Sequence, residues 1–176
     1  MGIAARYGVV LGTLLAVTAA LQGCALLPGT RVDAANPQVV RNTDRPHATV
    51  YFIRPRTERT MAEADNELTI DLDHQRLLTL VKGEYTLARL KPGKFTLTVT
   101  STTSMYIKTP KLHKIKRSRD FTFAAGKTYY IVMQMVNGEF RGVYNVPVQV
   151  EAMKARRIVK YLRAIGTAKD DPINPV

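Results

Sequence analysis

Apolar and polar residues alternate along much of the chain between His47 and Pro147, which is the pattern of half-buried β-strands. In the segment 95–100, apolar residues point one way and threonines the other. The segment 67–73 alternates in the same way, whereas the segment 128–136 is apolar on both faces and predicts a central strand. Further strands are expected at 49–53, 76–81, 84–90, 120–123 and 139–146.

Turn residues separate these strands. Lys91–Lys94 contains Pro-Gly and predicts a turn, and Gly126 marks another. Asn137-Gly138 is typical of a tight two-residue hairpin.

After Pro147 the apolar residues recur at steps of three and four, which predicts an amphipathic helix over 148–166 capped by Gly166. A polar tail, 167–176, follows. We therefore predict a mainly β fold, in which residues 47–147 form an antiparallel β-sandwich of about seven or eight short strands with a C-terminal amphipathic helix.

The amino terminus has the pattern of an export signal. Residues 1–23 combine one early cation with a charge-free apolar run of about 13 residues, too short to span a bilayer as a helix. The run ends in Leu21-Gln22-Gly23-Cys24, which resembles a bacterial lipobox. We expect cleavage before Cys24, a diacylglyceryl thioether on its sulfur and acylation of the new amine, with no other cofactor. Ala25 in place of Asp favours the outer membrane, which puts the domain on its periplasmic face.

Residues 24–46 comprise the lipidated cysteine and a predicted flexible tether, because Pro and Gly recur there without a sustained apolar pattern. The alternative is that Val39 and Val40 dock as an edge strand.

Composition narrows the function further. The 176 residues carry a net charge of +12 and a single cysteine, which excludes a disulfide framework and a Cys-rich zinc site. The densest charge is a basic cluster made up of Lys108, Lys111, Lys114, Lys116, Arg117 and Arg119. It predicts a solvated loop or a long hairpin, either merely solubilising or attracted to anionic lipid, lipid A or peptidoglycan. An exported domain rarely meets chromosomal DNA, so nucleic acid is not expected as a partner.

No motif assembles a catalytic or metal site. His47, His74 and His113 lack a Ser or Cys partner at motif level, and the acidic residues of 67–73 lie on a straight strand that supplies few calcium ligands. Tyr129 and Tyr130 point to opposite faces of a strand, so one is a core residue and the other either packs or forms a recognition platform.

Four short pieces carry a family resemblance: Val50–Pro55, Gly83–Tyr85, Leu90–Leu97 and Ala125–Ile131. In this order they resemble a family of bacterial lipoproteins with a domain of unknown function, over roughly Ala48 to Leu162. The resemblance implies an envelope location and a prealbumin-like or immunoglobulin-like sandwich, and it implies no activity or ligand. The segment 101–119 is longer and more basic than this resemblance leads us to expect.

The leading hypothesis is a non-catalytic, outer-membrane-anchored lipoprotein that binds an anionic envelope component or an envelope protein. The alternatives are an assembly or anchor component of a secretion or surface-appendage system and, third, an envelope enzyme.

Overall fold

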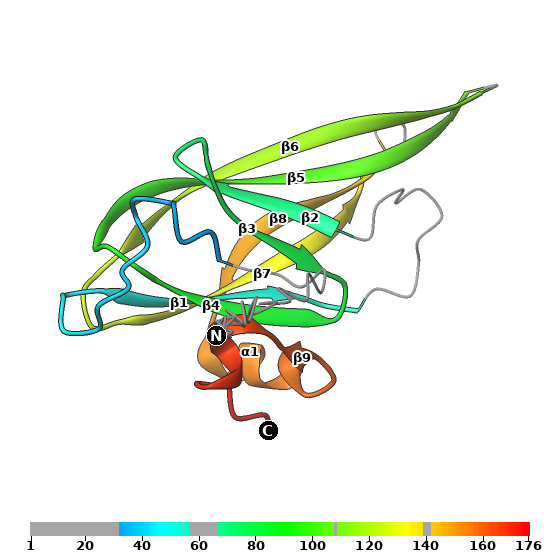
Figure 1. Cartoon of the computed structure of the whole chain (residues 1–176). Helices are drawn as coiled ribbons and strands as arrows, with labels where there is room; N and C mark the ends of the chain where they lie inside the picture. Colours follow the sequence, from blue (N-terminus) through cyan, green and yellow to red (C-terminus); the bar gives the residue numbers. More distant parts are fainter. Residues whose placement is uncertain (1–31, 57–66, 108, 139–141) are drawn as a thin grey trace, which may run out of the picture.

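The computed structural model describes residues 32–56, 67–107, 109–138 and 142–176 (Figure 1). Within them the chain forms two β-sheets that pack face to face, with a short helix and the C-terminal segment on the outer side of one sheet. The predicted mainly β sandwich is confirmed. The predictions for residues 1–31, which include the export signal and Cys24, concern residues outside the described part of the chain.

Sheet A has five described strands, in spatial order β8 (Val143–Val150), β7 (Thr128–Asn137), β1 (Ala48–Arg54), β4 (Glu84–Leu90) and β9 (Arg163–Ala164). Sheet B has four, in the order β3 (Gln75–Val81), β2 (Glu67–Leu72), β5 (Gly93–Ile107) and β6 (Thr109–Phe123). The helix α1 (Ala152–Val159) and the 3-10 helix η2 (Gly166–Lys169) follow β8.

The sandwich is not antiparallel throughout. β1 pairs with β4 in the antiparallel sense but with β7 in the parallel sense, and β9 runs parallel to β4. A parallel pair needs a long crossover between its strands, and here sheet B lies in sequence between β1 and β7. Local alternation carries no information about strand direction, so the sequence did not show this.

Two apolar clusters hold the layers together. The cluster between the sheets contains Phe52 and Leu90 from sheet A and Ile70, Leu97 and Phe123 from sheet B. Aromatic rings extend it, since Phe121 and Phe123 stack with their centroids 6.1 Å apart. The inward-facing half of each alternating strand supplies this cluster, as the sequence pattern predicted.

The second cluster lies on the outer face of sheet A. Ile53 and Leu87, both fully buried, pack there against Ala155 and Val159 of α1 and against Ile173. Strands of sheet A are therefore covered on both faces. This explains why every residue of β1 except the half-buried Thr49 is buried, where a half-buried strand would alternate.

The C-terminal segment differs from the helix predicted over 148–166. Val148 and Val150 still belong to β8, and α1 spans only Ala152–Val159. After it, Arg163 and Ala164 pair with β4. Tertiary pairing therefore overrides the helical period at both ends of the predicted helix.

The predicted polar tail also docks. Ala168 and Ile173 are buried, and the Tyr51 hydroxyl donates a hydrogen bond of 2.9 Å to the carbonyl of Asp171. The hydroxyl of Thr86 donates to the carbonyl of Ile165 at 3.0 Å. The last residues of the chain thus belong to the folded domain.

The described part of the predicted tether, from Val32 onward, lies against the sandwich. Val39 forms a β-bridge with Leu90, and the Val40 amide donates a 2.8 Å hydrogen bond to the carbonyl of Arg89. Asn36 is buried, with its side-chain amide donating to the carbonyls of Gln75 and Arg76. This corrects the prediction of a tether free along its whole length, and it is the docking that the alternative expected of Val39 and Val40.

The connection between β7 and β8 is also longer than predicted. A tight turn at Asn137-Gly138 would start the return strand at residue 139, but Asn137 pairs with Val143. The Gly138 amide donates to the carbonyl of Gly142 at 3.0 Å and closes the wider loop. The two-residue hairpin is found instead at Asp73-His74, where both residues have positive φ (48° and 67°).

Candidate binding surfaces

The basic cluster predicted from the sequence lies on a long hairpin. β5 and β6 pair residue for residue from Gly93 with Phe123 to Ile107 with Thr109. Of the two predicted forms, a loop or a hairpin, the structure has the hairpin, and it projects beyond the other strands of sheet B (Figure 1). Lys108 lies outside the described residues, and of Lys111 only the backbone is described.

The four remaining cations of the cluster lie on β6, the edge strand of sheet B. Lys114, Lys116 and Arg119 are exposed. Arg117 points to the other sheet, and its guanidinium carbon sits 4.2 Å from the centroid of the Tyr144 ring. Three of these cations are therefore available to solvent, whereas Arg117 fastens the hairpin to β8. We call Lys114, Lys116 and Arg119 the β6 cations.

The outer face of sheet B is polar and extends the surface around these cations. The Thr96 hydroxyl donates to Asp120 at 2.7 Å, and the hydroxyls of Thr98 and Ser118 lie 2.8 Å apart. Thr100 pairs with Lys116 across the hairpin and with Thr69 of β2. Cross-strand hydrogen bonds made by hydroxyl groups fix this face, which also carries Lys114 and Lys116, whereas Arg119 points to the opposite face of β6.

The edge of β8 is closed by the hairpin. The Ser101 hydroxyl accepts hydrogen bonds from the backbone amide of Asn145 at 2.9 Å and from its side-chain amide at 3.3 Å. The Thr103 hydroxyl accepts from the amide of Val143 at 3.3 Å. Pro147, two residues further along β8, has no amide hydrogen to satisfy. Side-chain hydroxyls thus replace the missing neighbouring strand.

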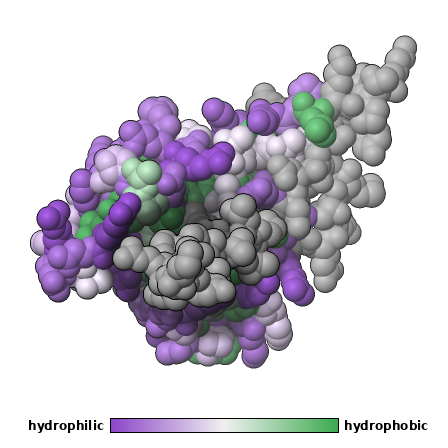
Figure 2. All heavy atoms as spheres, viewed as in Figure 1, coloured by the Kyte–Doolittle hydropathy of each residue, from purple (hydrophilic) through white to green (hydrophobic). Residues whose placement is uncertain are grey.

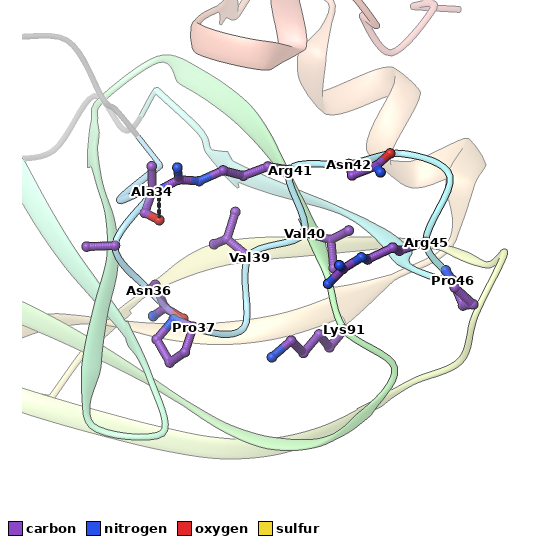
Figure 3. A pocket seen from close by; sticks show the side chains of 11 residues that line it. Ala34, Asn36, Pro37, Val39, Val40, Arg41, Asn42, Arg45, Pro46 and Lys91 are labelled. Atoms are coloured by element: carbon purple, nitrogen blue, oxygen red, sulfur yellow. Dashed lines mark hydrogen bonds between the residues drawn. The ribbon is translucent and has the colours of Figure 1, made fainter.

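An open pocket of about 610 Å³ lies under the docked N-terminal segment (Figure 3). Its floor is apolar, formed by Val39, Val40 and two prolines, and its rim carries Arg41, Arg45 and Lys91. The Arg41 guanidinium donates to the carbonyl of Ala34 at 2.5 Å, so one cation also ties the segment to itself. The lining contains no carboxylate or nucleophile, and its chemistry suits an anion with an apolar part. Sequence reasoning missed this pocket, since it depends on the docking of residues 32–46.

Two buried charged residues belong to the scaffold. Arg54 and Glu84, 2% and 3% exposed, are paired in register across β1 and β4. Arg54 donates to the carbonyl of Leu80 at 2.7 Å, and the Glu84 carboxylate accepts from the guanidinium of Arg163, which is mostly exposed. The pair of Glu84 with Arg163 attaches β9 to β4, so these charges stabilise the fold.

The tyrosines are packing residues. Tyr129 meets the Phe123 ring edge-on at 5.0 Å and its hydroxyl accepts from the Ala124 amide, while Tyr130 stacks on Tyr51 at 5.5 Å. The two side chains do lie on opposite faces, and both pack rather than form a platform. Burial raises the pKa of Tyr51, and the charge of Asp171 raises it further; burial also raises the pKa of Tyr85, against a smaller lowering by a hydrogen bond from the backbone of Ile173.

The three histidines lie in three different structural settings. His47 donates from Nδ1 to the carbonyl of Arg45 at 2.8 Å, His74 occupies the hairpin turn, and His113 is exposed on β6. In the described part of the chain, no three His, Cys, Asp or Glu residues gather as a metal site would require. Asp73, a candidate calcium ligand in the sequence, accepts the amide of Thr96 at 2.9 Å instead.

Comparison with known proteins defines the class of this sandwich. The family model described as "protein of unknown function (DUF2846)" matches residues 44–147. The chain therefore belongs to that family, and the predicted relationship to a family with a domain of unknown function is confirmed. No curated protein and no solved structure matches the chain. Among the described residues, no helix has the length and apolarity needed to cross a bilayer.

Proposed function

We propose that this protein is a non-catalytic lipoprotein of the bacterial outer membrane, anchored through Cys24, whose sandwich binds an anionic component of the envelope on the periplasmic side. Leu21, Gln22 and Gly23 complete the cleavage motif. Acyl chains on the cysteine are the only added group in this proposal, and anchors with two or more chains hold stably.

The observation that carries the proposal is the exposure of the three β6 cations along one edge strand. Lys114 and Lys116 lie on its outer face, beside hydroxyl groups held by cross-strand hydrogen bonds, and Arg119 is exposed on its other face. A solubilising role would require only exposed charge. A hairpin fixed to β8 by Ser101, Thr103 and Arg117 instead holds its charges in one arrangement, which favours recognition of an anion with regular spacing such as peptidoglycan carboxylates.

The test is binding of the purified lipidated protein in detergent to isolated sacculi. Replacing all three β6 cations with Ser should weaken salt-sensitive binding by at least tenfold, since each charge near an anionic surface contributes roughly 1 kcal/mol. The matched control replaces two lysines and one arginine that are exposed away from β5 and β6, Lys127, Lys169 and Arg156, and should leave most of the binding intact. Equal losses in both variants would show that only net charge matters and would contradict the proposal.

A second candidate function is assembly with an envelope protein, and the length of the edge strand favours it. β6 has 15 residues and, within the described chain, a strand neighbour on one side only. Such an edge accepts a partner strand through main-chain hydrogen bonds. Slowed amide exchange over β6 in a stoichiometric native complex would favour assembly, whereas binding to sacculi without such slowing favours the anionic component.

A further inference from the structure

The outward face of α1 combines positive charge with exposed apolar side chains. Between Ala152 and Arg163 the chain carries five basic residues and no acidic one. Met153 and Tyr161 are 51% and 75% exposed, and they flank the exposed Arg157 and Lys160. Positions 153, 157 and 160 are separated by four and three residues, so they lie on one side of the helix, while the opposite side buries Ala155 and Val159. We call Met153, Lys154, Arg157, Lys160 and Tyr161 the α1 face.

The stability of the fold does not explain this face. Arg157 in the last turn complements the helix dipole, but Lys154 in the first turn opposes it, at a place where an acidic residue would be stabilising. Tyr161 leaves most of its surface exposed, and Met153 leaves half of its surface exposed. Figure 2 shows hydrophobic patches among hydrophilic atoms at this lower end of the molecule, over α1 and the C-terminal segment.

The chain enters the domain at the edge of the sandwich, where the Asp33 amide donates to the carbonyl of Leu77 of β3 and η2 lies nearby. Val32, the first described residue, borders a hollow of about 210 Å³ together with Leu87 of β4 and Thr167 of η2. Eight peptide steps separate Cys24 from Val32, a reach of at most about 29 Å when fully extended. A domain of this size is on the order of 40 Å across. An anchor at Cys24 therefore keeps this side of the domain within one molecular width of the membrane.

The two basic surfaces lie at opposite ends of the molecule. The β5–β6 hairpin points away from α1 in Figure 1. Only one of them can rest on the membrane at a time, and the short connection to Cys24 favours the α1 face. Cations with an exposed aromatic ring and a thioether are the composition of an interfacial surface, in which the charges meet lipid phosphates and the apolar groups enter the headgroup region.

We propose that the α1 face seats the domain on an anionic lipid surface, so that the β6 cations point away from the membrane. This inference rests on the proposed lipid anchor and assigns a second, non-covalent contact to the same membrane. A covalent chain fixes only distance, whereas the α1 face would fix orientation. The occupant is the lipid surface, because the anchor at Cys24, at most about 29 Å of chain from Val32, brings a membrane to this side of the domain.

The experiment uses the fact that Cys24 is the single cysteine of the chain. Acylation blocks its thiol, so an engineered cysteine becomes the sole site for a polarity-sensitive fluorophore. The lipidated protein carrying Met153→Cys or Tyr161→Cys is labelled at the new cysteine. It is then reconstituted in vesicles of phosphatidylcholine with or without about 30% phosphatidylglycerol. The matched control is Leu112→Cys on β6, which is similarly exposed, at 69%.

Both α1 labels should shift to an apolar environment only in the anionic vesicles, while the label at 112 stays aqueous. The shift should be lost at 1 M salt, where the Debye length is about 3 Å. The triple variant K154S/R157S/K160S should lose the shift at position 161 and remain anchored. Aqueous α1 labels in anchored protein, or an apolar label at 112 instead, would overturn the inference.

Failure of the anchor itself is distinguishable. If Cys24 of the native protein reacts with maleimide, the thiol is free and the proposed function fails first. Binding of that unlipidated protein to the anionic vesicles by cosedimentation then tests the α1 face directly: a loss of about tenfold or more in the triple variant supports the inference, and unchanged binding refutes it.

Discussion

The outer faces of the two sheets differ in polarity and in whether other parts of the chain cover them. On sheet A the outer face is apolar and covered by α1, η2 and the C-terminal residues, with Ile53 and Leu87 fully buried. On sheet B it is a surface of threonines and charged residues whose side chains, apart from the buried Thr98, are half-buried or exposed. The same sandwich therefore has one closed sheet, which supplies stability, and one half-open sheet, where a partner can bind.

This difference is visible in the strand patterns. In β2 the buried residues Leu68, Ile70 and Leu72 alternate with residues that face solvent, while β1 is buried at nearly every position. Substitutions on the outer face of sheet B should cost little stability, because no apolar layer packs on that face. Three predictions test the comparison, in order of decreasing effect.

The largest effect is expected on the closed face. Leu87→Ala removes a fully buried side chain between sheet A and its helical cover and should lower the free energy of unfolding by about 3 kcal/mol. Thr100→Ala, at the equivalent outer face of sheet B, should change it by less than about 1 kcal/mol. Urea denaturation of both variants measures the two values, and similar losses would mean that the outer faces do not differ as described.

An intermediate effect is expected where the open sheet meets the closed one. Ser101→Ala leaves the buried amide groups of Asn145 without their acceptor and should lower the free energy of unfolding by about 2 kcal/mol. Thr102→Ala, the next residue, points to the other side and serves as control. Amide exchange should also become faster at Asn145 in the first variant alone. Unchanged exchange there would show that the hydroxyl does not seal β8.

The smallest effect depends on pH. Tyr51→Phe keeps the stacked ring and loses the hydrogen bond to Asp171, which should lower the free energy of unfolding at neutral pH by about 1 kcal/mol. Because the folded state raises the pKa of Tyr51, both states hold the proton below pH 10, and above it the unfolded state loses the proton first. Wild-type stability should therefore fall as pH rises above 10.

Tyr51→Phe should reduce that alkaline loss, which urea titrations at several pH values would measure. A variant with the wild-type slope above pH 10 would assign the alkaline sensitivity to another group, of which Tyr85 is the first to examine.

Local pattern predicted the parts of the fold that depend on local physics. Alternation at 67–73 identified β2, and the doubly apolar run at 128–136 identified the interior position of β7. The apolar pattern did not predict the outer halves of β5 and β6 as strands, because Thr, Ser and Lys give no apolar period. These halves are strands because they pair with each other across the hairpin. The sequence did not predict β9, because its two residues form a strand only by pairing with β4.

Of the candidate surfaces, too, some residues were predicted from the sequence and others were found only in the structure. Charge density alone pointed to Lys114, Lys116 and Arg119, and these are exposed. It also pointed to Arg117, whose ring contact with Tyr144 appears only in three dimensions. The pocket beneath residues 32–46 had no sequence signal, because breakers such as Pro37 and Pro46 suggested a free segment while Asn36 and Val39 fastened it.

The docking of Ile173 joins a late segment of the chain to strands that are made much earlier. A chain that emerges amino end first delivers this side chain after everything it must cover. Until Ile173 docks, part of the apolar outer face of β1 and β4 stays exposed to solvent, so removal of the segment that carries Ile173 should destabilise the domain.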